Sequence, residues 1–313
     1  MTIRTFTAGD DAAQVSIYNE AAADLPKFKA VTLDELRRRL RGPDFDPTTR
    51  FFAVEGGRPV GYASFHLNGR VSFPWCRKGR EEWAEPLFDA VLQAMRARSL
   101  PAAFAAYRVD WPVQCDFFLA HGFTLAREMI NFIMELVDMP TPSARPTVLI
   151  EPMTAADLPA VLTLGSKEFR TRGAAELERH LLHNPYFPAN SVQVLRRRSN
   201  AEPVGLSILV ENPAYADPHQ MDALAPCFRL GAVGTEGMQT KRVNGLFSFA
   251  AADGPSLTPI GLDLLGQATL RLHDTDVSTL AAQVASDAPH LLRFYQQYFR
   301  GQGSFPIYQL SLA

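Results

Sequence analysis

The stretch Ser278–Leu312, STLAAQVASDAPHLLRFYQQYFRGQGSFPIYQLSL, predicts the closing unit of a mixed α/β fold. Its apolar start is typical of a buried strand, its Asp and Pro mark a turn that opens a short amphipathic helix, and a second strand follows. An earlier stretch, Ala102–Leu136, AAFAAYRVDWPVQCDFFLAHGFTLAREMINFIMEL, has the same strand, helix, strand order. The chain therefore carries this closing unit twice.

Alignment of the two closing units identifies one chemical difference between them. Asp110 aligns with Asp287, 177 positions apart by subtraction, and the same offset places Phe118 opposite Tyr295. Only the second copy therefore has a hydroxyl group at this position of its helix.

The similarity extends back through both halves, as expected for an internal duplication. Each half opens with a strand, then a threonine as the predicted helix N-cap and an aspartate three residues later: Thr7 with Asp10, and Thr154 with Asp157. In parallel, the halves are predicted to contain a helix (Leu33–Leu40; Ala175–Leu182), a hairpin (Arg50–Glu55 with Pro59–Phe65; Ser191–Leu195 with Pro203–Leu209), a further strand (Val71–Trp75; Phe228–Thr235) and a long helix (Glu82–Arg98; Pro259–Leu272).

A segment rich in proline and small polar residues, Asp138–Thr147, separates the halves. We predict a first domain at 1–138, a linker at 139–147 and a second domain at 148–313. Each domain is expected to be an α/β (α+β) domain, with a mixed, mostly antiparallel sheet flanked by helices.

The composition excludes several classes of function. With 47% hydrophobic and 20% charged residues and a net charge of -2, the chain has no global positive charge for nucleic acid or an anionic membrane. Three cysteines without metal-ligand spacing predict neither a metal site nor a disulfide framework. The N-terminus lacks the apolar run of a signal peptide, and no membrane-spanning stretch is present, so we expect a cytoplasmic protein.

The element order, together with FFLAHGF at Phe117–Phe123 and VASDAPHLLRFYQQYF at Val284–Phe299, resembles the GNAT N-acetyltransferase superfamily. The second stretch departs from the family with Asp287 where Asn is frequent and Phe299 where Gly is usual. The resemblance covers both halves and implies two tandem GNAT-like domains. It also implies acetyl-CoA as co-substrate and transfer of an acetyl or other acyl group to a primary amine of a small molecule or peptide.

The resemblance further implies a glycine-containing loop that binds pyrophosphate at a helix N-terminus. In the first half the corresponding segment is Arg77–Ala84, where Glu81 and Glu82 would repel the ligand, so this copy is expected to be degenerate. In the second half the candidate loop is Gln239–Gly245, which is otherwise a solvated basic turn. The cofactor-binding residues implied there are Val233, Gly234, Gln239, Thr240, Lys241, Arg242, Val243, Asn244, Gly245 and Asp287.

For catalysis, the resemblance assigns Tyr295 as the proton donor to the leaving thiolate, since a phenol with a reference pKa near 10 is protonated at neutral pH. Glu236 is a candidate base acting through water. The alternative for Tyr295 is a core tyrosine whose hydroxyl is satisfied. The alternative for the whole chain is a non-catalytic binding protein with both cofactor loops degenerate, and the sequence leaves a monomer or a homodimer open.

Overall fold

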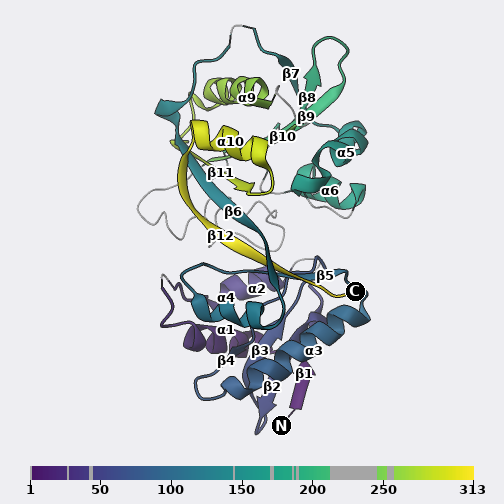
Figure 1. The fold of residues 1–313 in the computed structure, drawn as a ribbon, viewed down its shortest axis with the longest axis vertical. Coiled ribbons are helices and arrows are strands. Elements are labelled where there is room, and N and C mark those ends of the chain that lie inside the picture. The colour runs from purple at the N-terminus through teal and green to yellow at the C-terminus, as the bar shows by residue number, and fades with distance from the viewer. Residues whose placement is uncertain are drawn as a thin grey trace. The chain divides into compact units, whose positions relative to one another are not determined.

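The computed structural model describes residues 2–26, 28–41, 45–143, 145–169, 173–184, 187, 190–211, 245–251 and 257–313. The chain forms two compact units, which we call unit 1 (Met1–Glu128 with Ser304–Ala313) and unit 2 (Met129–Gly303). Each unit contains mostly antiparallel strands flanked by helices (Figure 1). The predicted fold class is therefore confirmed.

Unit 1 contains a sheet of order β1-β2-β3-β4, antiparallel throughout. Its fifth strand, β5, pairs antiparallel with the end of β12. The elements are β1 (Thr2–Thr5), α1 (Asp10–Ala21), α2 (Leu33–Leu40), β2 (Arg50–Glu55), β3 (Arg58–Ser64), β4 (Trp75–Cys76), α3 (Ala84–Ala97), β5 (Ala102–Ala106) and α4 (Pro112–Ala120).

Unit 2 contains strands in the order β6-β11-β10-β9-β8-β7, in which only β10 and β11 are parallel. The elements that follow α4 are β6 (Thr124–Glu135), β7 (Val148–Pro152), α5 (Leu158–Phe169), α6 (Ala174–Leu181), β8 (Val192–Arg197), β9 (Pro203–Val210), β10 (Gly245–Ala251), α9 (Leu257–Leu272), β11 (Thr279–Ala285), α10 (Pro289–Tyr298) and β12 (Arg300–Ser311).

The two units exchange strands. Met129–Glu135 of β6 belongs to the first sequence half, but it pairs with β11 of unit 2 through seven residue pairs. In return, β12 ends in unit 1, where Ile307 to Ser311 pair with β5. The compact units therefore do not coincide with the two halves of the sequence, because each half supplies a strand to the unit formed mainly by the other.

The proline-rich segment between the halves packs against α9. The backbone N–H and hydroxyl of Thr147 both donate to the buried carboxylate of Asp263, each at 2.5 Å. A Cβ on Gly266 would lie 2.8 Å from the Cα of Pro142, so the absence of a side chain there permits the approach. The segment predicted as a linker is thus held on the surface of unit 2.

The two halves begin their first helices differently. In unit 1 the residue before α1 is Gly9, with φ of 99°, so the predicted N-cap at Thr7 was wrong, although Asp10 still accepts from the Thr7 N–H at 2.7 Å. In unit 2, Thr154 opens a 3₁₀ turn and forms the predicted capping box with Asp157, at 2.9 Å. The difference follows from the left-handed backbone that Gly9 allows.

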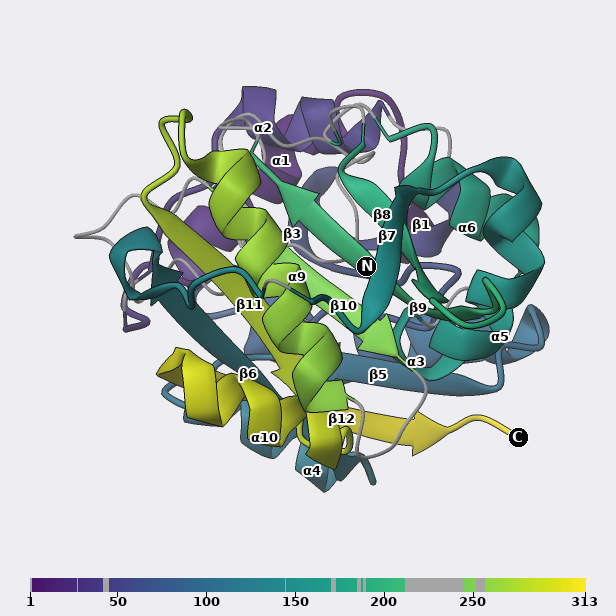
Figure 2. The ribbon, with the colours of Figure 1, turned by 90° about the horizontal axis from the view of Figure 1, so that it is seen from above.

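Two apolar clusters lie on opposite faces of the unit 2 sheet. One is formed by α9, α10 and strand residues such as Phe132, Phe247 and Phe249, and the other by α5, α6 and residues such as Ile133 and Ala281. Figure 2 shows α9 lying across β10 and β11. The alternation of side chains along the strands thus fills both faces.

We expect Gly261→Ala to destabilise unit 2. A Cβ at Gly261 of α9 would lie 2.6 Å from Phe294 Cζ and 3.0 Å from Phe249 Cζ, inside a packed core. Overpacking of this kind costs about 1–3 kcal/mol, which chemical denaturation would measure. Gly301→Ala is the matched control, because nothing lies within 4 Å of its added Cβ; equal stability of the two variants would contradict the predicted close packing.

Candidate active site

The central parallel strands of unit 2 diverge soon after they meet. β10 and β11 pair only at Gly245 with Leu280 and at Leu246 with Ala281. Farther on, β10 pairs only with β9, and β11 pairs only with β6, in the described part of the chain. The facing edges beyond these pairs therefore have backbone groups available for a ligand in extended conformation.

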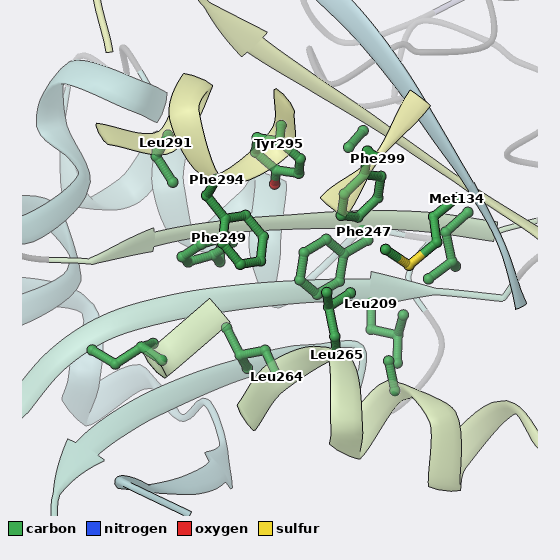
Figure 3. Packing of buried hydrophobic residues seen from close by; sticks show 14 of the residues in the cluster. Met134, Leu209, Phe247, Phe249, Leu264, Leu265, Leu291, Phe294, Tyr295 and Phe299 are labelled. Atoms are coloured by element: carbon green, nitrogen blue, oxygen red, sulfur yellow. The ribbon is translucent and has the colours of Figure 1, made fainter. Parts of the chain in front are cut away.

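Tyr295 on α10 reaches this opening. Its ring is 1% exposed, and its hydroxyl has no hydrogen-bond partner within the described residues. Figure 3 shows the hydroxyl pointing from α10 toward the sheet. Burial raises the pKa of Tyr295, against smaller opposing effects of the Phe249 backbone N–H and the Ser248 hydroxyl. The phenol is therefore a protonated, unpaired donor beside a free strand edge.

Aromatic rings fix the position of Tyr295. Phe132 stacks on it with ring centroids 5.7 Å apart, Phe299 meets it edge-on at 5.0 Å, and Phe249 lies at 6.1 Å. This apolar surround disfavours the phenolate and restricts the side chain to one orientation. The prediction of a buried tyrosine is confirmed, whereas the satisfied hydroxyl of the core alternative is not found.

The central strand of unit 2 is β10, and not the predicted Phe228–Thr235. Because β10 is hydrogen-bonded to β9 on one side and to β11 on the other, the central place is taken. Glu236 and the other predicted residues of 233–244 lie outside the described residues, so the roles predicted for Val233, Gly234, Gln239, Thr240, Lys241, Arg242, Val243 and Asn244 stay predictions.

Two predicted cofactor residues are described. Gly245 is the first residue of β10, and a Cβ there would lie 2.7 Å from Leu280 Cδ2, so the glycine allows close strand packing. It precedes a strand and not a helix, which is not the position of a helix-opening loop. Asp287 is exposed in the turn before α10. Neither residue lies on the diverging edges of β10 and β11.

The sequence reasoning missed β10. Its residues GLFSFAA combine aromatic and small side chains, and Phe247 and Phe249 alternate toward the core, which is the signal of a half-buried strand. The helix that follows it is α9, so the segment 252–256, ADGPS, has the chain position that Arg77–Arg80 has in unit 1. That segment lies outside the described residues.

In unit 1 the equivalent opening is closed by the chain's own groups. Phe118 takes the place of Tyr295 and is fully buried. The Tyr107 hydroxyl accepts a hydrogen bond from the Phe73 N–H at 2.6 Å, and burial raises the pKa of Tyr107 to about 12. Phe73, Trp75 and Tyr107 pack together here. A ligand would find neither a free amide at Phe73 nor a donor at the Phe118 position.

Carboxylates also occupy the loop before α3 in unit 1. Glu20 accepts from the Lys78 backbone N–H at 3.1 Å and pairs with Arg77, while Glu81 accepts from the Gly79 N–H at 3.0 Å. These backbone hydrogen bonds hold the pKa of Glu81 below its usual range. The amides that would bind a pyrophosphate are therefore already paired with anionic groups, as expected for a degenerate copy.

We expect Arg77→Glu to leave acetyl-CoA affinity unchanged, because Arg77 serves an internal ion pair with Glu20. Calorimetric titration of the variant with acetyl-CoA would measure this. Arg80→Glu is a suitable control, since Arg80 pairs with Glu55 in the same loop. A marked loss of affinity in either variant would move the cofactor site to unit 1.

Other site chemistries were searched across the described residues. No group of three or more His, Cys, Asp or Glu side chains able to hold a metal ion occurs among them. Within the same ranges, no helix has the length and apolar character needed to cross a membrane. The two cysteines in the described ranges, Cys76 and Cys115, are buried thiols.

Comparisons with known proteins agree with this architecture. No protein-family model matches the chain. A stretch of 63 residues is 43% identical to the mycothiol acetyltransferase of Thermomonospora curvata, and this match spans 20% of the chain and 21% of that protein.

Solved structures are similar along the whole chain. A GCN5-related N-acetyltransferase from Sphaerobacter thermophilus has a TM-score of 0.61 at 12% identity, with 99% of this chain and 95% of that chain covered. A tandem GNAT protein from the clavulanic acid biosynthesis pathway has a TM-score of 0.55 at 12% identity, with 100% and 98% covered. The chain therefore has the tandem GNAT fold that the closing units predicted.

Proposed function

We propose that unit 2 is an acyl-CoA-dependent N-acyltransferase that moves an acetyl group from acetyl-CoA to a primary amine. The observation that carries this proposal is the unpaired Tyr295 hydroxyl beside the diverging edges of β10 and β11. The partial likeness to a mycothiol acetyltransferase supports acetyl transfer as the reaction class.

The residues present fit such a co-substrate. Acetyl-CoA supplies an acyl thioester and an extended arm with amide groups. The free edge of β10 can pair with such an arm, and the Phe249 N–H, close to the Tyr295 hydroxyl, can stabilise negative charge on a carbonyl oxygen. Tyr295 is left unpaired by the protein, so its hydrogen-bonding capacity is available to a substrate.

The reaction follows from these groups. The amine nitrogen forms a bond to the acyl carbon, the carbon–sulfur bond breaks, and Tyr295 donates its proton to the departing sulfur. The aromatic surround keeps Tyr295 protonated up to alkaline pH, because burial raises its pKa. The amine gives up its proton to a base or to water.

Calorimetry with acetyl-CoA, followed by a thiol-release assay with a panel of primary amines, tests the proposal. We expect binding by the whole chain and release of CoA that depends on the amine. Binding without amine-dependent release would favour a non-catalytic binding protein, and the absence of binding would refute the acyltransferase function.

A further inference from the structure

An amide pair interrupts the apolar α5/α6 face of the unit 2 sheet. Asn131 on β6 lies opposite Gln283 on β11, and the Gln283 Nε2 donates to Asn131 Oδ1 at 2.8 Å. Two positions away on the same strands, Ile133 and Ala281 belong to the apolar cluster packed against α5 and α6. Strand alternation therefore predicts apolar side chains at 131 and 283 as well.

The amide pair borders the opening that Tyr295 reaches. Ala281 is the last residue of β11 that pairs with β10, at Leu246. Ser248 and Gln283 each lie two residues farther along, so they share one face of the two strands where these diverge. The Ser248 hydroxyl is close enough to Tyr295 to influence its pKa.

The pair has unused hydrogen-bonding capacity. Asn131 is 8% exposed, and its Nδ2 group has no partner within the described residues. The Gln283 Oε1 is likewise without one there. Exchange of nitrogen and oxygen in both amides still leaves one free donor and one free acceptor. Such groups are costly to bury without a partner, which favours a ligand group that both donates and accepts.

This requirement selects a chemical class. A hydroxyl or an amide both donates and accepts a hydrogen bond, whereas a carboxylate only accepts and an ammonium only donates. Because Tyr295 approaches from the α9/α10 face, the α5/α6 face is left for the molecule that receives the acyl group.

We propose that Asn131 and Gln283 bind a hydroxyl or amide of the acceptor amine and so select neutral, polar acceptors. This inference rests on the proposed acyltransferase function of unit 2. It also means that the first sequence half supplies a specificity residue, Asn131, to the site formed mainly by the second.

The test uses the full chain and two amines of similar ring size, glucosamine and cyclohexylamine. We compare wild type with the double variant Asn131→Leu/Gln283→Met, which replaces both partners by apolar groups of similar shape and so leaves no orphaned amide. We expect unchanged acetyl-CoA affinity and unchanged or higher stability. The kcat/KM for glucosamine should fall about tenfold or more, as for one or two lost neutral hydrogen bonds, with little change for cyclohexylamine.

Each other outcome has a defined meaning. If wild type does not bind acetyl-CoA, the proposed function fails and this inference fails with it. If wild type binds acetyl-CoA but acetylates both amines equally, or neither, only the inference is overturned. An equal loss for both amines in the double variant also overturns it, because the pair would then support the fold and not the acceptor.

Discussion

Tyr295→Phe lowers kcat about a hundredfold or more and leaves the protein as stable as wild type. The activity falls because the phenol is the proton donor to the leaving sulfur, and general acids contribute about 10²–10⁴-fold. The stability is kept because the hydroxyl is buried without a partner in the described residues, so its removal relieves an unsatisfied group. Thiol release under saturating acetyl-CoA and thermal unfolding measure the two effects.

The chain offers both a precedent and a control for this variant. Phe118, at the equivalent position of unit 1, is fully buried, so a phenylalanine fits the same helix context. Tyr298→Phe, on the same helix and packed against Phe294 at 5.0 Å, should keep full activity. Full activity of Tyr295→Phe would refute its role as acid. A loss of stability without a loss of kcat would identify it as a core residue.

A fragment of residues 148–303 does not fold cooperatively, whereas a fragment of residues 129–303 does. The two differ by a segment that includes the part of β6 paired with β11. That strand buries Phe132, Ile133 and Met134 in the two clusters of unit 2. Each fully buried side chain contributes about 1.5–3 kcal/mol, so their loss rivals the whole net stability of about 5–15 kcal/mol.

Urea unfolding followed by circular dichroism, with hydrogen exchange at β11, compares the two fragments. In the shorter fragment β11 becomes an unprotected edge, and fast exchange and aggregation are expected. Equal, cooperative unfolding of both fragments would show that the exchanged strand is dispensable. Mixing separately produced 1–138 and 148–313 chains should restore the full set of strand pairs.

The sequence predicted most of the fold because the two copies support each other. Arg50–Glu55 and Leu33–Leu40 match β2 and α2 at both ends, since their alternation and helical spacing are strong. The matching prolines at 112 and 289 correctly placed the starts of α4 and α10. Even the residues before these helices share a backbone conformation, with φ of -115° at Trp111 and -111° at Ala288.

The candidate site was predicted only in part. Tyr295 came from comparison with Phe118, but the free state of its hydroxyl depends on the packing of α10 against β10, which no local pattern encodes. The central strand was assigned to Phe228–Thr235 because that run is also apolar, while Gly245 was interpreted as part of a loop. Asn131 was not found because its contact with Gln283 lies 152 positions away.

The strand exchange could not be predicted from periodicity. Alternation shows which residues of β6 and β12 face a core, but it does not say which core, because both closing units have the same order of elements. The choice between two similar sheets depends on long-range pairing and on the path of the chain.

The exchanged strands also set an order for folding on the ribosome. The edge of β5 in unit 1 is covered only by the end of β12, which is synthesised after all of unit 2. The N-terminal unit therefore cannot complete its sheet while the nascent chain is elongating, in contrast to domains that fold one after another during synthesis. Translation pauses within the second half would prolong the exposure of β5, and chaperones that recognise unpaired strands would act on the first half for longest.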